Sequence, residues 1–126
     1  MYPTLFTTAG LKQFAEALDA ERQAQLAKWG DQQHPDGTGA EYYVAMADEA
    51  RDICQHAAKY REKGAPWALI LLEEVYEALA ETDPDLLRTE LVQCAAVIQA
   101  WVSDIDRRAV AEFEAQLAQH GDGDGS

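Results

Sequence analysis

The chain has 126 residues, of which 48% are hydrophobic and 26% charged, and its formal net charge is −13. This composition is typical of a folded globular domain rather than of a disordered segment. The excess of acids argues against binding to a nucleic-acid polymer or to an anionic membrane, since both partners require a basic surface. A nucleotide is still compatible with this charge, because a bound metal ion can reverse the field locally.

The sequence indicates neither a secretory signal nor a membrane span. No positively charged N-terminal segment is followed by an apolar run. The longest apolar run, Ala65–Leu72, is far too short to cross a bilayer. We therefore expect a cytoplasmic protein with no membrane partner. Both cysteines, Cys54 and Cys94, fall among apolar helical positions, so we expect two buried free thiols.

The first predicted helix runs from about Ala9 to Trp29. Thr7 and Thr8 can cap its N-terminus, because a threonine hydroxyl can accept a hydrogen bond from a backbone N–H of the first turn. Gly30 ends the helix, and the segment that follows is rich in turn-forming residues, which predicts a loop.

A short break separates the second and third predicted helices. The second is expected from about Ala40 to Lys63, and Gly64 ends it. Pro66 then lies in the first turn of the third helix, where proline is favourable, and this helix runs to about Glu81. The apolar stripe predicted for the second helix consists of Met46, Ala50, Ile53, Ala57 and Tyr60.

The fourth predicted helix is the longest. Asp83 can cap it, Pro84 is its first residue, and it runs to about Gln119. Residues 120–126 are expected to form a disordered tail. Nothing in the sequence is typical of a strand, so we predict an all-α antiparallel four-helix bundle that forms a single domain over residues 1–119.

The third helix is apolar around more than half of its circumference. Such a helix requires neighbours on two sides, and a second copy of the chain would supply one of them. We therefore expect a homodimer or a homotetramer. One apolar face consists of Leu69, Leu72, Tyr76 and Leu79, and it is widened by Leu71, Val75 and Ala78.

Acidic residues converge from the third and fourth predicted helices. Glu74 and Glu77 lie one turn apart on the third helix, and Glu73 lies at the border of the same face. Glu90 and Gln93 lie one turn apart at the edge of the apolar stripe of the fourth helix. Carboxylates from two packed helices suit a hard divalent cation, so Glu74, Glu77 and Glu90, with Glu73 at the border, are candidate ligands of Mg²⁺, with Mn²⁺ as the alternative ion.

Two interpretations of this acidic face are open. In the simpler one, the glutamates form a solvated helix face and bind nothing. Against it, the sequence between Gly64 and Leu87 holds six acids and no Lys or Arg, so the usual ion pairs along a helix are absent. Like charges at this density destabilise a helix unless something binds them, which favours a metal site and, with it, phosphate chemistry.

Polar residues interrupt the apolar stripe of the first helix near its C-terminal end. Arg22 and Gln25 occupy positions on this stripe before Trp29, and buried polar groups need partners. Either Arg22 reaches solvent or a glutamate where the bundle opens, or this end of the helix lines a substrate pocket. In the second case Arg22 meets phosphate or an acidic ligand, Gln25 contacts a base edge and Trp29 stacks on the base. His34, in the following loop, is either exposed or a further contact to base or sugar.

The two acidic motifs together resemble a known superfamily. An E-x-x-E pattern on one helix followed by E-x-x-D on the next is typical of the all-α NTP pyrophosphohydrolases, which include the MazG-like and dimeric dUTPase proteins. In this chain the two patterns read Glu74-Val-Tyr-Glu77 and Glu90-Leu-Val-Gln93. An apolar turn precedes the first pair, and an alanine-rich helical segment follows the second.

The segment upstream of the acidic helices is similar to the same superfamily. The stretch from Glu21-Arg22 through Lys28-Trp29-Gly30 is similar to the N-terminal segment of phage and bacterial MazG-like proteins. Trp29 and the pair His34-Pro35 are similar to the segment before the first acidic helix in dCTP-hydrolysing members. The resemblance covers roughly Ala20–Arg107. The substrate-binding residues that it favours are Arg22, Gln25, Trp29 and His34.

The resemblance implies a Mg²⁺-dependent enzyme that hydrolyses a nucleoside triphosphate to the monophosphate and pyrophosphate. Glu74, Glu77 and Glu90 would hold the metal ion. One of these carboxylates, directly or through the metal, would activate the attacking water.

Gln93 departs from the pattern of the superfamily, because it stands where the family has an aspartate. An amide oxygen can coordinate Mg²⁺, but it brings no charge and is a poor base. Three alternatives follow: the site binds fewer ions, Glu73 or Glu81 substitutes for the missing acid, or the protein binds a nucleotide without cleaving it.

Overall fold

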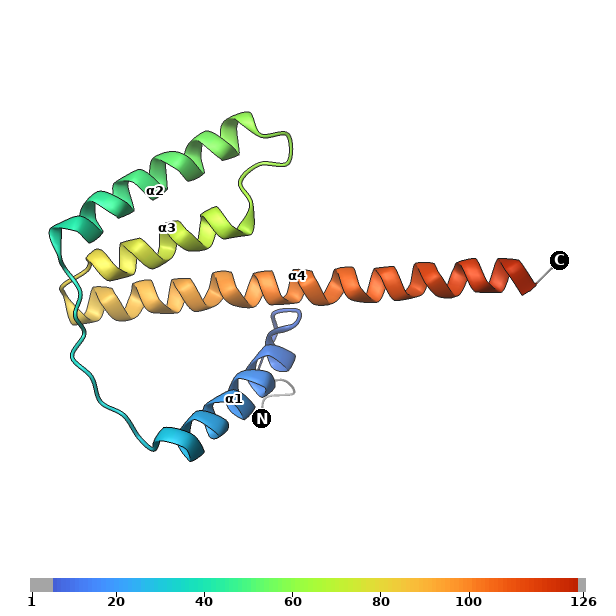
Figure 1. Cartoon of the computed structure of the whole chain (residues 1–126), viewed down its shortest axis with the longest axis horizontal. Helices are drawn as coiled ribbons and strands as arrows, with labels where there is room; N and C mark the ends of the chain where they lie inside the picture. The colour runs from blue at the N-terminus through green and yellow to red at the C-terminus, as the bar shows by residue number, and fades with distance from the viewer. Residues whose placement is uncertain (1–5, 125–126) are drawn as a thin grey trace. The chain divides into compact units, whose positions relative to one another are not determined.

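The computed structural model describes residues 6–124, and every regular element in that range is an α-helix. The four helices are α1 (Leu11–Trp29), α2 (Glu41–Tyr60), α3 (Trp67–Ala80) and α4 (Pro84–Asp124) (Figure 1). The predicted all-α class is therefore confirmed. In the described part of the chain, no helix is both long enough and apolar enough to cross a membrane.

The chain divides into two compact units. Unit 1 comprises Met1–Ala24 and Gln99–Ser126, and unit 2 comprises Gln25–Ile98. Besides the end of α1, unit 2 therefore contains three helical elements, which are α2, α3 and residues 84–98 of α4. Both acidic motifs lie in it. Within this unit the three helices run antiparallel, and α3 lies between α2 and α4 (Figure 1). The single domain predicted over residues 1–119 stays a prediction.

The last helix is longer than the sequence predicted. It continues to Asp124, whereas the expected end was near Gln119. The helix thus covers residues 120–124 of the segment that was expected to be disordered, and residues 125–126 lie outside the described residues.

The N-terminus of α4 is capped as the sequence predicted. The Asp83 carboxylate oxygen Oδ1 accepts hydrogen bonds from the backbone N–H groups of Asp85 at 2.9 Å and Leu86 at 3.1 Å. Pro84 is the first helical residue, where its missing N–H has no cost. The cap satisfies two of the backbone donors that a helix start leaves without partners.

Hydrogen bonds to the Glu81 side chain and from the loop before α2 hold the turn between α3 and α4. Glu81 Oε1 accepts hydrogen bonds from the backbone N–H groups of Thr82 and Asp83, both at 3.1 Å. The backbone N–H of Gly39 donates to the carbonyl of Leu79 at 2.8 Å. Gly39 has a φ of +92°, and a Cβ at this position would collide with the Thr82 side chain, so the close approach requires glycine. These contacts fix the spacing between the two acidic motifs.

The face that α2 buries consists of small residues. Because small side chains allow two helices to approach closely, α2 and α3 can pack tightly along this face. The buried face coincides only in part with the predicted stripe: Ala50 and Ala57 are buried, but Met46, Ile53 and Tyr60 are 40%, 43% and 66% exposed. The prediction for these three residues was wrong. The buried residues of α2 are Ala47, Ala50, Cys54 and Ala57.

A second cluster joins α3 to α4. It consists of Ala78, Leu87 and Cys94, with Val75 packed against it. Cys54 and Cys94 are both buried and free, as the sequence predicted. The apolar contacts of unit 2 therefore lie on both sides of α3. The acidic residues of α3 lie on a helix that packs against both α2 and α4.

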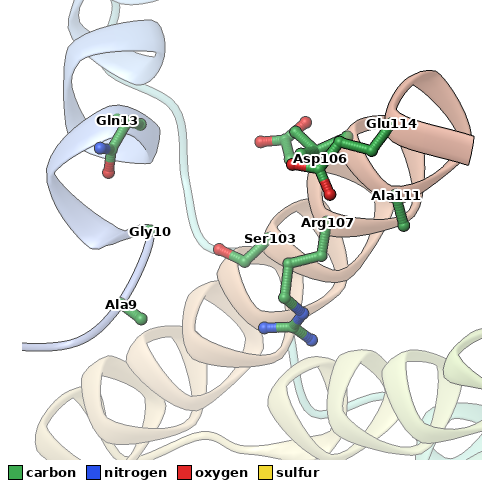
Figure 2. A pocket seen from close by; sticks show the side chains of 9 residues that line it. Ala9, Gly10, Gln13, Ser103, Asp106, Arg107, Ala111 and Glu114 are labelled. Atoms are coloured by element: carbon green, nitrogen blue, oxygen red, sulfur yellow. The ribbon is translucent and has the colours of Figure 1, made fainter. Parts of the chain in front are cut away.

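In unit 1, a buried amide holds the start of α1. The Gln99 side-chain nitrogen Nε2 donates to the carbonyl of Ala9 at 3.3 Å and to Ser103 Oγ at 2.8 Å. Gln99 and Ser103 are both buried. Gly10 has a φ of +80°, and a Cβ there would collide with Ser103 Oγ. A pocket of about 540 Å³ adjoins this contact and is lined in part by Gln13 and Ser103 (Figure 2).

The cap at Asp83 gives a stability prediction. Replacing Asp83 by alanine should destabilise the protein by about 1 kcal/mol, because two backbone N–H groups lose their acceptor. The melting temperature should fall by several degrees in thermal denaturation followed by circular dichroism. Thr89→Ala is the matched control, since it removes only a bond to the carbonyl of Asp85 on the exposed face of the same helix. Equal effects of the two substitutions would contradict the proposed cap.

Candidate metal centre

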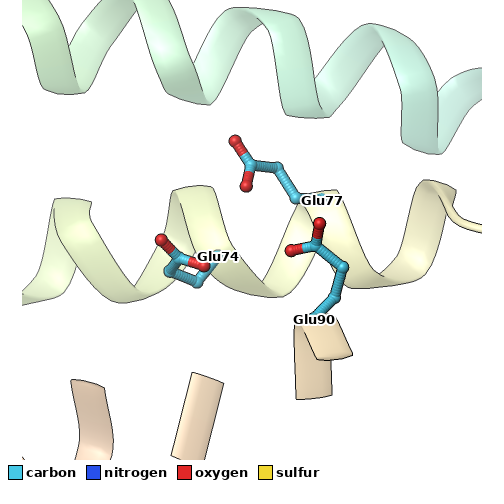
Figure 3. A group of neighbouring side chains, drawn as sticks. All are labelled: Glu74, Glu77 and Glu90. Carbon is cyan, nitrogen blue, oxygen red and sulfur yellow. The ribbon is translucent and has the colours of Figure 1, made fainter. Parts of the chain in front are cut away.

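Three glutamates from α3 and α4 converge on one point. Glu74, Glu77 and Glu90 each offer one carboxylate oxygen, and these oxygens all lie within 4.8 Å of one another (Figure 3). Glu74 and Glu77 meet because they are separated by one helical turn. Glu90 joins them because the short turn at residues 81–83 folds α4 back along α3. These three residues are called the acidic cluster below.

The acidic cluster contains buried oxygens that lack partners. Its three residues are all partly buried. Among the described residues, Oε2 of Glu74 and Oε2 of Glu90 are buried and accept no hydrogen bond. A buried carboxylate oxygen without a partner is costly, typically by about 1–3 kcal/mol or more. A cation coordinated by these oxygens would remove that cost.

Burial and mutual repulsion both act on the protonation of the acidic cluster. Burial raises the pKa of Glu74 above its ordinary value, and the charges of Glu77, Glu90 and Glu73 raise it further. Burial also raises the pKa of Glu77, followed by the charges of Glu73 and Glu90. The Arg51 guanidinium acts in the opposite direction on the pKa of Glu77 without reversing the shift. The ionised cluster is therefore destabilised in the absence of a cation.

Arg51 on α2 supplies positive charge at the edge of the cluster. Its Nη2 lies 3.6 Å from Glu77 Oε1, and its Nη1 lies 3.3 Å from Asp48 Oδ1. The sequence did not indicate this residue, because the predicted stripe of α2 contained Met46 and Ile53 in place of the buried Ala47 and Cys54. Arg51 lies four residues after Ala47 and three before Cys54, both buried, so a correctly placed α2 stripe would have revealed it.

Two thiols lie close to the carboxylates. Burial raises the pKa of Cys54, and a hydrogen bond with Glu73 raises it further. Burial also raises the pKa of Cys94, followed by the charge of Glu74. Both thiols are therefore kept protonated and neutral beside the acidic cluster, which leaves oxygen atoms as the available ligands.

The other candidate ligands lie outside the acidic cluster. Glu73 is partly buried and interacts with Cys54. The Oε1 atom of Glu81 is engaged by the backbone of the α3–α4 turn. Gln93 lies one turn beyond Glu90 on α4, and its side chain is exposed. The participation of Glu73 and Gln93 in metal binding stays a prediction.

The four candidate substrate-binding residues are divided between the units. Arg22 belongs to unit 1, whereas Gln25, Trp29 and His34 belong to unit 2. Trp29 is 57% exposed, and Lys28 Nζ lies 4.7 Å from its ring centroid. His34 Nε2 lies 3.2 Å from the side-chain oxygen of its neighbour Gln32. These contacts are local, and the role of the four residues in substrate binding stays a prediction.

Comparison of the chain with protein-family models, with curated proteins and with solved structures finds no match in any of the three. The functional interpretation therefore depends on the chemistry of the acidic cluster. Three carboxylates, two of which have a buried oxygen without a partner, are a donor set that suits a hard divalent cation. Their geometry fits such an ion without identifying it as Mg²⁺.

The repulsion within the acidic cluster gives a pH-dependent prediction. Glu74→Gln should raise the melting temperature of the metal-free protein at neutral pH by a few degrees, because it removes one of three neighbouring charges. Since the pKa of Glu74 is raised on folding, ionisation costs stability as the pH rises through that pKa. The advantage of the variant should therefore shrink as the pH falls into the acid range, where the native glutamate is also neutral.

The control for this measurement is Glu62→Gln, which removes an exposed carboxylate just after α2. Melting curves of the metal-free proteins recorded with a chelator between pH 4 and 8 provide the comparison, over roughly the range in which a raised carboxyl titrates. If Glu74→Gln is no more stable than the native protein at neutral pH, the cluster is not under electrostatic strain.

Proposed function

We propose that this chain is a divalent-cation-dependent nucleoside triphosphate pyrophosphohydrolase of the all-α MazG-like type. It would convert a ribo- or deoxyribonucleoside triphosphate to the monophosphate and pyrophosphate in the cytoplasm. The observation that carries the proposal is the acidic cluster, in which three carboxylates from two helices approach within 4.8 Å and two buried oxygens lack partners. The resemblance of its two motifs to the superfamily supplies the class of reaction.

The chain's own residues would perform distinct tasks in this reaction. A bound Mg²⁺ would neutralise phosphate oxygens and lower the pKa of water. Glu74 and Glu90 would hold the ion through their unpartnered buried oxygens. Glu77, the third carboxylate of the cluster, would complete the ligand set or accept a proton from the attacking water. The apolar contacts on both sides of α3 would keep these carboxylates in place.

The substrate would be held by residues outside the acidic cluster. In this proposal, Trp29 stacks on the base, which its 57% exposure allows. Gln25 contacts the base edge, and His34 contacts base or sugar. Arg22 meets the phosphates, where a guanidinium can form paired hydrogen bonds.

We further propose that the protein is a homodimer or a homotetramer. The support is an exposed apolar surface along α2 and α3 in unit 2. It contains a groove of about 190 Å³, to which Met46, Ile53 and Leu72 contribute. Apolar residues exposed together in this way favour association with another protein surface.

A second candidate function is nucleotide binding without cleavage. Gln93 favours it, because an exposed neutral amide stands where the superfamily has an acid. A protein of this kind would keep the cation and the nucleotide but would lack the full set of charges for hydrolysis. Measurements of binding and of turnover separate the two functions.

The enzyme proposal predicts pyrophosphate release. With Mg²⁺ or Mn²⁺ present, at least one of the common ribo- or deoxyribonucleoside triphosphates should yield pyrophosphate and the monophosphate. Glu90→Gln should lower the rate by roughly a hundredfold or more, because it removes one ligand of the ion. A coupled pyrophosphate assay measures the rates, and Glu112→Gln, which changes an exposed acid in the second half of α4, is the control.

Two results would overturn parts of this proposal. If no triphosphate is cleaved at any Mg²⁺ or Mn²⁺ concentration, the enzyme claim fails. If, in addition, Mg²⁺ with nucleotide leaves the melting temperature unchanged, nucleotide binding fails as well, because a ligand that binds the folded state must stabilise it.

The position of Gln93 gives a separate prediction. Gln93→Asp should increase the affinity for Mg²⁺ by roughly tenfold if the side chain faces the ion, because it adds a charged ligand one turn from Glu90. Titration calorimetry with Mg²⁺ alone measures the change. The control is Gln116→Asp, which makes the same substitution on the exposed second half of α4, away from both acidic motifs. Equal affinities of the two variants would show that Gln93 lies outside the site.

A further inference from the structure

Arg51 divides its guanidinium between two carboxylates at the edge of the acidic cluster. Nη1 lies 3.3 Å from Asp48 Oδ1, and Nη2 lies 3.6 Å from Glu77 Oε1. The two partners differ in environment, since the side chain of Asp48 is 67% exposed and that of Glu77 is 25% exposed. Arg51 can therefore leave Glu77 and still keep an ionic partner on its own helix.

A divalent cation would compete with Arg51 for Glu77. The guanidinium carries a single charge, reaches one oxygen of the cluster from its edge, and leaves the buried oxygens of Glu74 and Glu90 without partners. An ion held by all three carboxylates carries twice that charge and satisfies those oxygens. At separations of a few ångströms, this difference favours the ion over the guanidinium.

We propose that Arg51 is an exchangeable counter-ion: it pairs with Glu77 in the metal-free protein, yields that carboxylate to the divalent cation, and then binds a phosphate group of the ligand. This inference rests on the proposed function, because it places a polyphosphate beside the ion. Arg51 is then a phosphate-binding residue of the site, and it lies on α2, which carries neither acidic motif.

Phosphate is the ligand that suits the released guanidinium. The side chain of Arg51 is 44% exposed, so a group arriving from solvent can reach it. A polyphosphate bound to the ion must lie close to the carboxylates of the cluster, and Arg51 reaches one of them at 3.6 Å. Arginine binds phosphate through paired, charge-assisted hydrogen bonds, whereas lysine offers a point charge.

The test measures the effect of Arg51 on cation binding separately from its effect on phosphate binding. It uses Mg²⁺ alone and then inorganic triphosphate with saturating Mg²⁺. Titration calorimetry on the full chain measures both affinities. Arg51→Met should bind Mg²⁺ alone roughly five- to tenfold more tightly, because a competing charge is gone. The same variant should bind triphosphate at least about tenfold more weakly, because a charge-assisted contact is lost.

Two further variants keep this test specific. Arg51→Lys should bind Mg²⁺ much as the native protein does and should bind triphosphate with intermediate affinity, since it keeps the charge and loses the planar fork. Arg61→Met, at the C-terminal end of α2, makes the same change in net charge away from Glu77 and should leave both affinities unchanged. Melting temperatures show whether each variant is folded.

The outcomes distinguish this inference from the proposed function. If the native protein binds neither Mg²⁺ nor triphosphate, the proposed function fails. If it binds both and Arg51→Met binds both equally well, the proposed function stands and the role of Arg51 is overturned. Weaker Mg²⁺ binding by Arg51→Met, or unchanged triphosphate binding, would also overturn the inference, because the exchange requires opposite effects on the two ligands.

Discussion

Repulsion between carboxylates at the interface of α3 and α4 is the constraint on which the rest of unit 2 depends. Glu74, Glu77 and Glu90 approach within 4.8 Å, and burial strengthens the repulsion between their charges. Helices that repel at such short range stay together only if other contacts hold them. The turn at residues 81–83 and the apolar cluster around Ala78 and Leu87 supply those contacts.

The small residues of α2 allow a second helix to pack against α3, on the side opposite α4. Because alanines and a cysteine form its buried face, α2 can approach α3 closely enough for Arg51 to reach Glu77 and for Cys54 to reach Glu73. Larger residues on this face would hold α2 further from α3 and leave the acidic cluster without the positive charge of Arg51. The composition of α2 thus has an electrostatic consequence on the neighbouring helix.

The sequence predicts those features that depend on local spacing. The Asp83 cap and the single-turn separation of Glu74 and Glu77 follow from helical geometry alone, and the structure contains both. The sequence does not predict Arg51, because the α2 stripe is ambiguous where alanines occur on several sides of the helix. Nor does it predict the contact of Gln99 with Ala9, which joins residues far apart in the chain through a polar side chain.

The two thiols beside the carboxylates bear on which ion the site can accept. A soft cation gains most from thiolate ligands, and a thiol must lose its proton to become one. Burial raises the pKa of both Cys54 and Cys94, and the neighbouring carboxylates raise it further, so thiolate formation is opposed by the same charges that attract a cation. The carboxylates, in contrast, are ionised at neutral pH once a cation offsets their repulsion, and can bind the ion directly. The surroundings of the acidic cluster therefore favour a hard, oxygen-binding ion over a soft one.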